Sequence, residues 1–228
     1  MNDDLYNKGL YADATIAREW SAWIESLQGE TREREIYPWF SSWIRRTRPG
    51  TILEIGSGQG ICSEKIDFLG VRYVGVEPAL HLRNRAHSLY PARTFIPGSA
   101  EQLPFDDQSF DAIFSVFVWQ HLPDLKVAAR ELVRVLKPSG FFAVVCPNPE
   151  LYELWLSWQK NVVITGKEAR GDFRMCSNHH MYLHTREEIT SAFAENFLVV
   201  DEVIPCGLAQ DRFPAGFTLI FSGHKKYA

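Results

Sequence analysis

The sequence lacks the cysteine spacing of disulfide-rich and zinc-binding domains. Its four cysteines lie far apart, without a CxxC pair, at Cys62, Cys146, Cys176 and Cys206. No Asn-x-Ser/Thr glycosylation sequence occurs, and the acidic start of the chain is unlike the basic start of a secretory signal peptide. We therefore expect a reduced, cytoplasmic protein. The acidic side chains between residues 147 and 184 are too scattered to hold an ion, so no metal is expected.

Long hydrophobic runs and a strong charge of either sign are also missing. The longest apolar runs, 112–119 and 140–146, are far shorter than the ~20 residues that cross a bilayer, so they indicate buried strands. The 24 Lys and Arg against 28 Asp and Glu give a net charge of −4, which lacks the basic surface that nucleic acids require. Neither a membrane nor a nucleic acid is expected as a partner. The length of 228 residues fits one large domain.

Short apolar runs do alternate with helical patterns through the middle of the chain. The predicted strands are 51–55, 73–76, 110–117 and 140–146, and the predicted helices are 61–69, 79–89 and 124–136. This alternation is typical of right-handed βαβ crossovers, so we predict a doubly wound, mostly parallel α/β sheet. A capping box at 185–188 predicts a further helix, followed by strands at 197–204 and 217–221.

The flanking segments complete the predicted organisation of a single domain, residues 1–228. Residues 1–48 have the periodicity of amphipathic helices and are expected to form a lid over a core of residues 49–146. Residues 147–184 break the rhythm and are expected to form an irregular cap insertion, before the helix and strands of residues 185–228.

A glycine loop follows the first predicted strand, in the sequence LEIGSGQG at residues 53–60. Glycines at alternate positions let the backbone turn sharply and approach a ligand closely. In an open α/β sheet a ligand binds beyond the carboxyl ends of the strands, where this loop is placed. A dinucleotide fingerprint would have its third glycine at position 61, which is Ile61.

Two acidic residues beside this loop favour a positively charged nucleoside as the ligand. Glu54 precedes the loop and would repel a pyrophosphate but attract a cation. Glu77 ends the second predicted strand, where a carboxylate can accept hydrogen bonds from both hydroxyls of a ribose.

At this point the chain resembles the class I S-adenosylmethionine-dependent methyltransferases that act on small molecules, whose first motif is similar to LDIGCGTG. Four later segments, in the same order as in the family, are similar to its GDAEXLPF, SFDXV, HHLPD and EXXRVLKPGG motifs: GSAEQLPF at 98–105, SFDAI at 109–113, QHLPD at 120–124 and ELVRVLKPSG at 131–140. The resemblance covers about residues 50–146. It implies a seven-stranded, Rossmann-like sheet and S-adenosyl-L-methionine as the cofactor.

The resemblance also implies which residues bind that cofactor. Glu54 would lie near the ammonium of the methionine portion, which would be lined by Gly56, Ser57, Gly58 and Gly60. Glu77 would bind the ribose, with Pro78 beside the adenine and Ser99, Ala100 and Glu101 along its edge. Ser115 and Val116 would flank the sulfonium. Position 99 departs from the family, which usually has Asp there, so a charge-assisted bond to the adenine is lost.

Methyl transfer is an in-line displacement at an already activated carbon, so alignment of the reactants supplies most of the catalysis. A general base is needed only when a hydroxyl or thiol arrives protonated, and the candidates are His121, His179, His180 and His184, of which His121 and His180 are preferred. We predict transfer to an oxygen or nitrogen of a small molecule. Aromatic residues in the lid and cap, including Trp20, fit either an aromatic or apolar acceptor or ordinary core packing.

Two other functions stay open from the sequence. One is a protein of the same fold that binds the cofactor without catalysis, as a regulator or as the partner of an active subunit. The other is an NAD-dependent oxidoreductase.

Overall fold

The chain folds around a central seven-stranded sheet, seen here in a computed structural model that describes residues 10–27, 31–66, 68, 70–173, 176–207 and 216–226. The strand order is β3-β2-β1-β4-β5-β10-β9. The strands are β1 (Thr51–Ile55), β2 (Arg72–Val76), β3 (Thr94–Ile96), β4 (Phe110–Val116), β5 (Leu136–Pro147), β9 (Leu198–Cys206) and β10 (Thr218–Lys225).

The first five strands are parallel, and β10 pairs antiparallel with both β5 and β9. The predicted mostly parallel, doubly wound sheet is therefore confirmed. Its winding reverses between the neighbouring strands β1 and β4, the position at which such sheets bind ligands.

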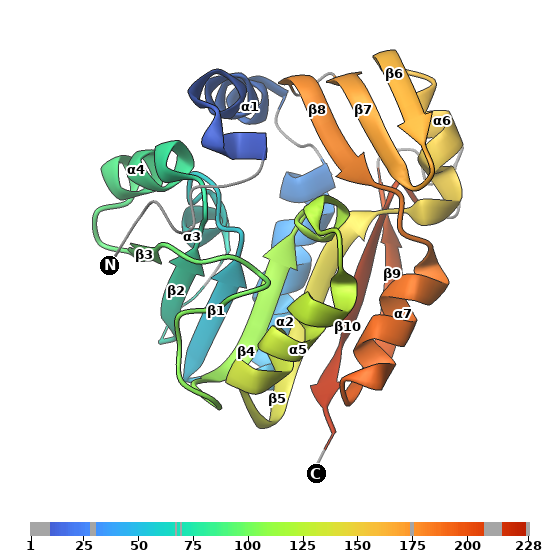
Figure 1. Ribbon diagram of the computed structural model, residues 1–228. Coiled ribbons are helices and arrows are strands. Elements are labelled where there is room, and N and C mark those ends of the chain that lie inside the picture. The colour runs from blue at the N-terminus through green and yellow to red at the C-terminus, as the bar shows by residue number, and fades with distance from the viewer. Residues whose placement is uncertain are drawn as a thin grey trace.

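Helices cover both faces of this sheet (Figure 1). On one face α5 (Leu125–Val135) and α7 (Arg186–Glu195) bury Leu132 and Phe193 against the strands. On the other, α2 (Tyr37–Thr47) and α4 (Leu80–Leu89) bury Phe40 and Ala86. Side-chain caps start the first pair: the Asp124 carboxylate accepts from two backbone N–H groups of α5, and Thr185 forms the predicted capping box of α7.

The predicted irregular insertion is instead regular structure, which corrects the sequence interpretation. After η5 (Pro149–Leu151) and α6 (Tyr152–Leu156), three antiparallel strands form a second sheet, β6 (Lys160–Thr165), β7 (Glu168–Phe173) and β8 (Cys176–Tyr182). We call residues 149–182 the cap. A small hydrophobic cluster that includes Ala169 and Met181 holds it together, so the cap has a core of its own.

The N-terminal segment lies at the same end of the molecule as the cap (Figure 1). It comprises η2 (Leu10–Ala12) and α1 (Ala14–Leu27), followed by the π-helix η3 (Arg32–Ile36), which leads into α2. One carboxylate oxygen of Glu19 accepts from the backbone N–H and the hydroxyl of Ser177, both at 2.7 Å, and so joins α1 to β8.

Some predicted bounds were wrong. Within the helix expected over 61–69, α3 covers Cys62–Lys65 and ends because Ile66 takes an extended conformation, while residues 67 and 69 lie outside the described residues. The helix expected to include Leu136 ends at Val135, and β5 begins at once. The last two strands are longer than predicted. Among the described residues, no helix combines the length and hydrophobicity needed to span a bilayer.

Candidate functional site

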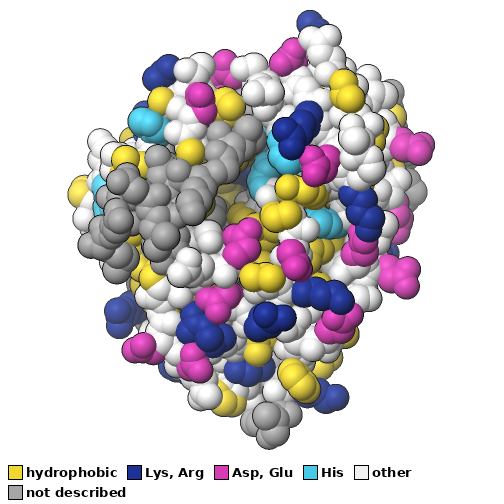
Figure 2. Space-filling view, in the orientation of Figure 1, with side chains coloured by type: hydrophobic (Ala, Val, Ile, Leu, Met, Phe, Trp, Pro, Cys, Tyr) yellow, Lys and Arg dark blue, Asp and Glu magenta, His cyan; other side chains and the backbone are white. Residues whose placement is uncertain are grey.

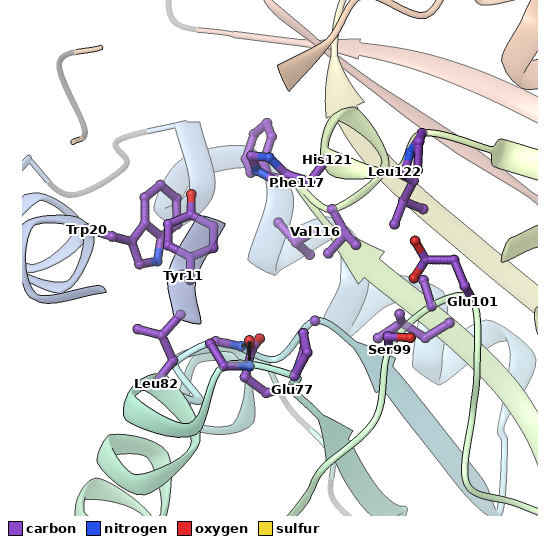
Figure 3. A pocket seen from close by; sticks show the side chains of 18 of the residues that line it. Tyr11, Trp20, Glu77, Leu82, Ser99, Glu101, Val116, Phe117, His121 and Leu122 are labelled. Carbon is purple, nitrogen blue, oxygen red and sulfur yellow. Dashed lines mark hydrogen bonds between the residues drawn. The ribbon is translucent and has the colours of Figure 1, made fainter. Parts of the chain in front are cut away.

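A cavity of about 590 Å³ opens at the carboxyl ends of β1, β2 and β4, a usual size for a ligand pocket. In Figure 3, Tyr11 and Trp20 face Ser99 and Glu101 across it, and Glu77 lies below them. The predicted site residues that line this cavity are Gly56, Gly58, Glu77, Pro78, Ser99, Ala100, Glu101, Val116, His121 and His180. The other predicted residues, Glu54, Ser57, Gly60 and Ser115, do not line it.

The glycine loop after β1 takes conformations that side chains disfavour. Gly56 has φ +70°, and a Cβ there would collide with the Val118 side chain. Gly58 has φ +54°, and a Cβ there would meet no atom within 4 Å, because it would point into open space. The loop thus presents bare backbone to the cavity, as a cradle for a closely approaching ligand.

The Glu77 carboxylate lies at the end of β2 and supports this loop. One of its oxygens accepts from the Gly58 N–H at 2.8 Å and the other from the Ala79 N–H at 2.9 Å. Burial raises the pKa of Glu77 to about 7, against the effect of these two hydrogen bonds. Each carboxylate oxygen can accept a further hydrogen bond, so Glu77 can still bind hydroxyl groups in the cavity that it lines.

Glu54 and Ser115 do not line the cavity as the prediction expected, because each lies one residue inside the carboxyl end of its strand, and the strand's last residue, Ile55 or Val116, lines the cavity instead. The Tyr73 hydroxyl donates to the buried Glu54 carboxylate, whose pKa is raised to about 7 by burial, on the sheet face covered by α2 and α4. The Ser115 hydroxyl accepts from the indole N–H of Trp119 at 3.0 Å, in the layer packed by α5. Neither side chain faces the cavity.

Ser57 and Gly60 shape the loop without lining the cavity. The Ser57 N–H donates to the Val76 carbonyl at 2.9 Å, which fastens the loop to the end of β2. Gly60 has φ +85°, and a Cβ there would lie 2.7 Å from the Phe95 ring. Both residues therefore hold the position of their neighbours Gly56 and Gly58.

The three histidines near the cavity differ sharply in their surroundings. His121 lies in η4 (Trp119–His121), and its Nδ1 is 3.2 Å from the carbonyl oxygen of His180. Its Nε2 is 3.2 Å from the Gln120 amide nitrogen, which also donates to the Phe117 carbonyl at 2.7 Å. A carbonyl only accepts and an amide N–H only donates, so Nδ1 carries the proton and Nε2 is already an acceptor.

These contacts correct the prediction of His121 as a general base. Both of its ring nitrogens are engaged, and burial lowers its pKa to about 4. His121 lines the cavity as a neutral ring that joins η4 to β8.

His180 lies on β8 and lines the cavity with a partly exposed ring. Its Nε2 is 3.2 Å from a carboxylate oxygen of Glu168 on β7. His179 is on the same strand but buried, and burial lowers its pKa to about 3. Of these three rings, His180 combines access to the cavity with a carboxylate partner.

Sequence reasoning missed several residues at the site. Tyr11 and Tyr182 line the cavity, although neither belongs to a motif. Arg32 lies with its guanidinium 4.8 Å from the Phe117 ring centre and lines a second hollow, of about 300 Å³, together with Gln59 of the glycine loop. The dense aromatic residues of the N-terminal helices were the only signal, and they pointed to Trp20, which does line the cavity.

The comparisons with known proteins point to one family. Residues 53–144 match the family model described as a methyltransferase domain. The demethylmenaquinone methyltransferase of Chlorobaculum parvum is 31% identical over 137 residues, which are 57% of each chain. The malonyl-[acyl-carrier protein] O-methyltransferase of Erwinia billingiae is 31% identical over 121 residues, 52% of this chain and 48% of the relative. This chain spans about half the length of the curated relatives that it matches.

Solved structures share the fold over nearly the whole chain. The PH0226 protein of Pyrococcus horikoshii has a TM-score of 0.75 at 18% identity and covers 89% of this chain and 93% of its own. A structure described as an S-adenosylmethionine-dependent methyltransferase of Clostridium acetobutylicum has a TM-score of 0.72 at 12% identity, over 92% of this chain and 98% of its own. At these identities the likeness concerns the fold.

Proposed function

We propose that the protein transfers a methyl group from S-adenosyl-L-methionine to an oxygen or nitrogen of a small molecule. The premise is the match of residues 53–144 to the methyltransferase-domain family. The observation that carries the proposal is the pairing of the glycine loop with Glu77. The backbone of Gly58 and the Glu77 carboxylate both line one cavity, and the carboxylate can accept further hydrogen bonds. This cavity lies where the sheet winding reverses, between β1 and β4.

The residues present suit the parts of this cofactor. Glu77 would accept from the ribose hydroxyls, and Pro78, Ser99, Ala100 and Glu101 would surround the adenine. Gly56 and Gly58 would adjoin the methionine portion, with the guanidinium of Arg32 supplying a positive charge for its carboxylate near Phe117. Val116 and Phe117 at the end of β4 would adjoin the sulfonium.

The bound cofactor supplies a methyl carbon already activated by a sulfonium, so the protein's main task is alignment. The described parts of residues 1–48 and 147–184 contribute Tyr11, Trp20, His180 and Tyr182 to the cavity, and we assign to these parts the roof that positions the acceptor and excludes water. A small molecule with an aromatic or apolar body fits these rings. When the acceptor arrives as a hydroxyl, His180 takes its proton.

Calorimetry with S-adenosylhomocysteine tests the proposal. The wild-type protein is expected to bind it saturably, and Glu77→Gln is expected to weaken binding by about tenfold to hundredfold, because bonds to a charged group are worth ~1.5–3 kcal/mol each. Glu195→Gln is the matched control, since Glu195 pairs with Lys126 at the surface. Absence of binding by the wild type, or equal dissociation constants for wild type and Glu77→Gln with unchanged thermal midpoints, would contradict the proposal.

A further inference from the structure

The acceptor side of the cavity is walled by rings from three separate parts of the chain. The Tyr11 ring centre lies 5.6 Å from that of Trp20 and 5.6 Å from that of His121, with an interplanar angle of 83° to the histidine. On β8, the rings of His180 and Tyr182 are 4.8 Å apart. All five residues line the cavity, and we call them the acceptor wall. Such mutually packed rings favour a flat guest at low entropic cost.

The charged side chains that line the cavity, among the described residues, are acidic. Among the lining residues that the structure describes, none is a lysine or arginine, whereas Glu77 and Glu101 are both present. The nearby Arg170 guanidinium donates to Glu168 at 3.0 Å. A carboxylate held against the acceptor wall, away from Arg32 near Phe117, would lose its hydration with no described lysine or arginine among the residues lining the cavity to pair with, which is strongly unfavourable.

The acceptor wall also contains a side chain that can accept a proton, His180. A carboxylate oxygen of Glu168 lies 3.2 Å from the buried Nε2 of His180, so Nε2 faces Glu168 and Nδ1 is the ring nitrogen left to accept a proton. His121 cannot serve, because both of its nitrogens have partners. A base of this kind matters for a hydroxyl of phenol type, whose pKa is about 10, and is not needed for an amine that arrives neutral.

We infer that the acceptor is an uncharged, ring-bearing compound with a phenol-like or enol-like hydroxyl, that carboxylates are excluded, and that Glu168 positions His180 for this chemistry. The inference rests on the proposed function. The hydroxyl proton moves to a ring nitrogen of His180 while the oxygen bonds to the methyl carbon. The carbon–sulfur bond breaks, its electron pair stays on sulfur, and His180 later releases the proton to solvent.

Binding of two probes to the protein saturated with S-adenosylhomocysteine tests the inference. 2-Naphthol and 2-naphthoate share one ring skeleton and differ in charge at neutral pH. Calorimetry is expected to show 2-naphthol binding at least about tenfold more tightly, since a buried carboxylate without a partner is costly. Equal or tighter binding of 2-naphthoate would overturn the inference, and so would failure of both probes to bind.

Variants at the acceptor wall test its physical basis. Tyr182→Arg adds a cation to the acceptor wall, so the ratio of the dissociation constants of 2-naphthoate and 2-naphthol is expected to fall by about tenfold. Tyr182→Phe adds no charge, so this ratio is expected to stay unchanged. His180→Phe retains a ring but loses the acceptor, so it is expected to weaken 2-naphthol by about tenfold and leave 2-naphthoate unchanged. An unaltered preference in Tyr182→Arg, or unaltered 2-naphthol binding in His180→Phe, would contradict the inference. Failure of S-adenosylhomocysteine itself to bind would instead refute the proposed function.

Discussion

At the scale of single residues, neighbouring histidines of one chain have different chemistry because of what surrounds their nitrogens. His121 is held neutral between a carbonyl and an amide, with its pKa lowered to about 4. His180 faces the cavity beside a carboxylate. A sequence motif names the residue type but does not say which hydrogen-bond partners it finds.

The lowered pKa of the partly buried His121 predicts a dependence of stability on pH. In the unfolded chain its pKa returns to the ordinary 6.5, so between pH 6.5 and 4 the unfolded state binds more protons. Stability from this group is present above pH 6.5 and is lost as the pH falls toward 4, by about 3 kcal/mol at most.

Urea unfolding at a series of pH values measures this loss. His121→Asn keeps an N–H donor for the His180 carbonyl but cannot titrate, so its free energy of unfolding is expected to fall less steeply with acid than that of the wild type. Parallel curves for the two proteins would refute the assignment. Glu54 and Glu77 titrate in both proteins, so their contribution cancels in the comparison.

At the scale of elements, the cavity is closed by segments distant in sequence. Helix α1 brings Trp20, strand β8 brings His180, and a single carboxylate, Glu19, ties the two elements together through Ser177. These hydrogen bonds also lower the pKa of Glu19. The junction between α1 and β8 therefore determines how firmly the acceptor wall is assembled.

Removing this tie is expected to loosen α1 without unfolding the core. In Glu19→Ala, backbone amides of α1 should exchange hydrogen about fivefold faster, corresponding to ~1 kcal/mol for an exposed charge-assisted contact. Arg18→Ala is the matched control, because the Arg18 guanidinium donates to the Thr15 hydroxyl of the same helix. Unchanged exchange in Glu19→Ala would show that other contacts hold the helix.

At the scale of the whole molecule, the cap and the sheet domain have separate hydrophobic cores. The cap cluster contains the fully buried Met181, whereas the sheet is packed by two larger clusters, one of which contains the equally buried Ile113. Separate cores allow separate opening, because local stability follows the contacts that each unit buries. We therefore expect the cap to loosen while the glycine loop and the central strands stay folded.

A pair of truncations tests this independence. Met181→Ala is expected to cost about 2–5 kcal/mol locally and to speed hydrogen exchange in β6, β7 and β8 while β1, β4 and β5 stay protected. Ile113→Ala is expected to lower the free energy of unfolding by a similar amount. It should speed amide hydrogen exchange in both the central sheet and the cap. Equal acceleration of the central strands by Met181→Ala would show that cap and core unfold as one unit.

The sequence by itself determined the parallel core, the glycine loop, the position of Glu77 at the end of β2 and the capping box of α7. These features follow from hydrophobic periodicity and turn chemistry within short windows of the chain, and the family resemblance covers the same region. Only the tertiary structure decided that Glu54 and Ser115 turn away from the cavity, that β6, β7 and β8 form a second sheet, and that Tyr11 and Tyr182 meet at one wall. Those outcomes depend on packing between segments far apart in sequence, which no local pattern encodes.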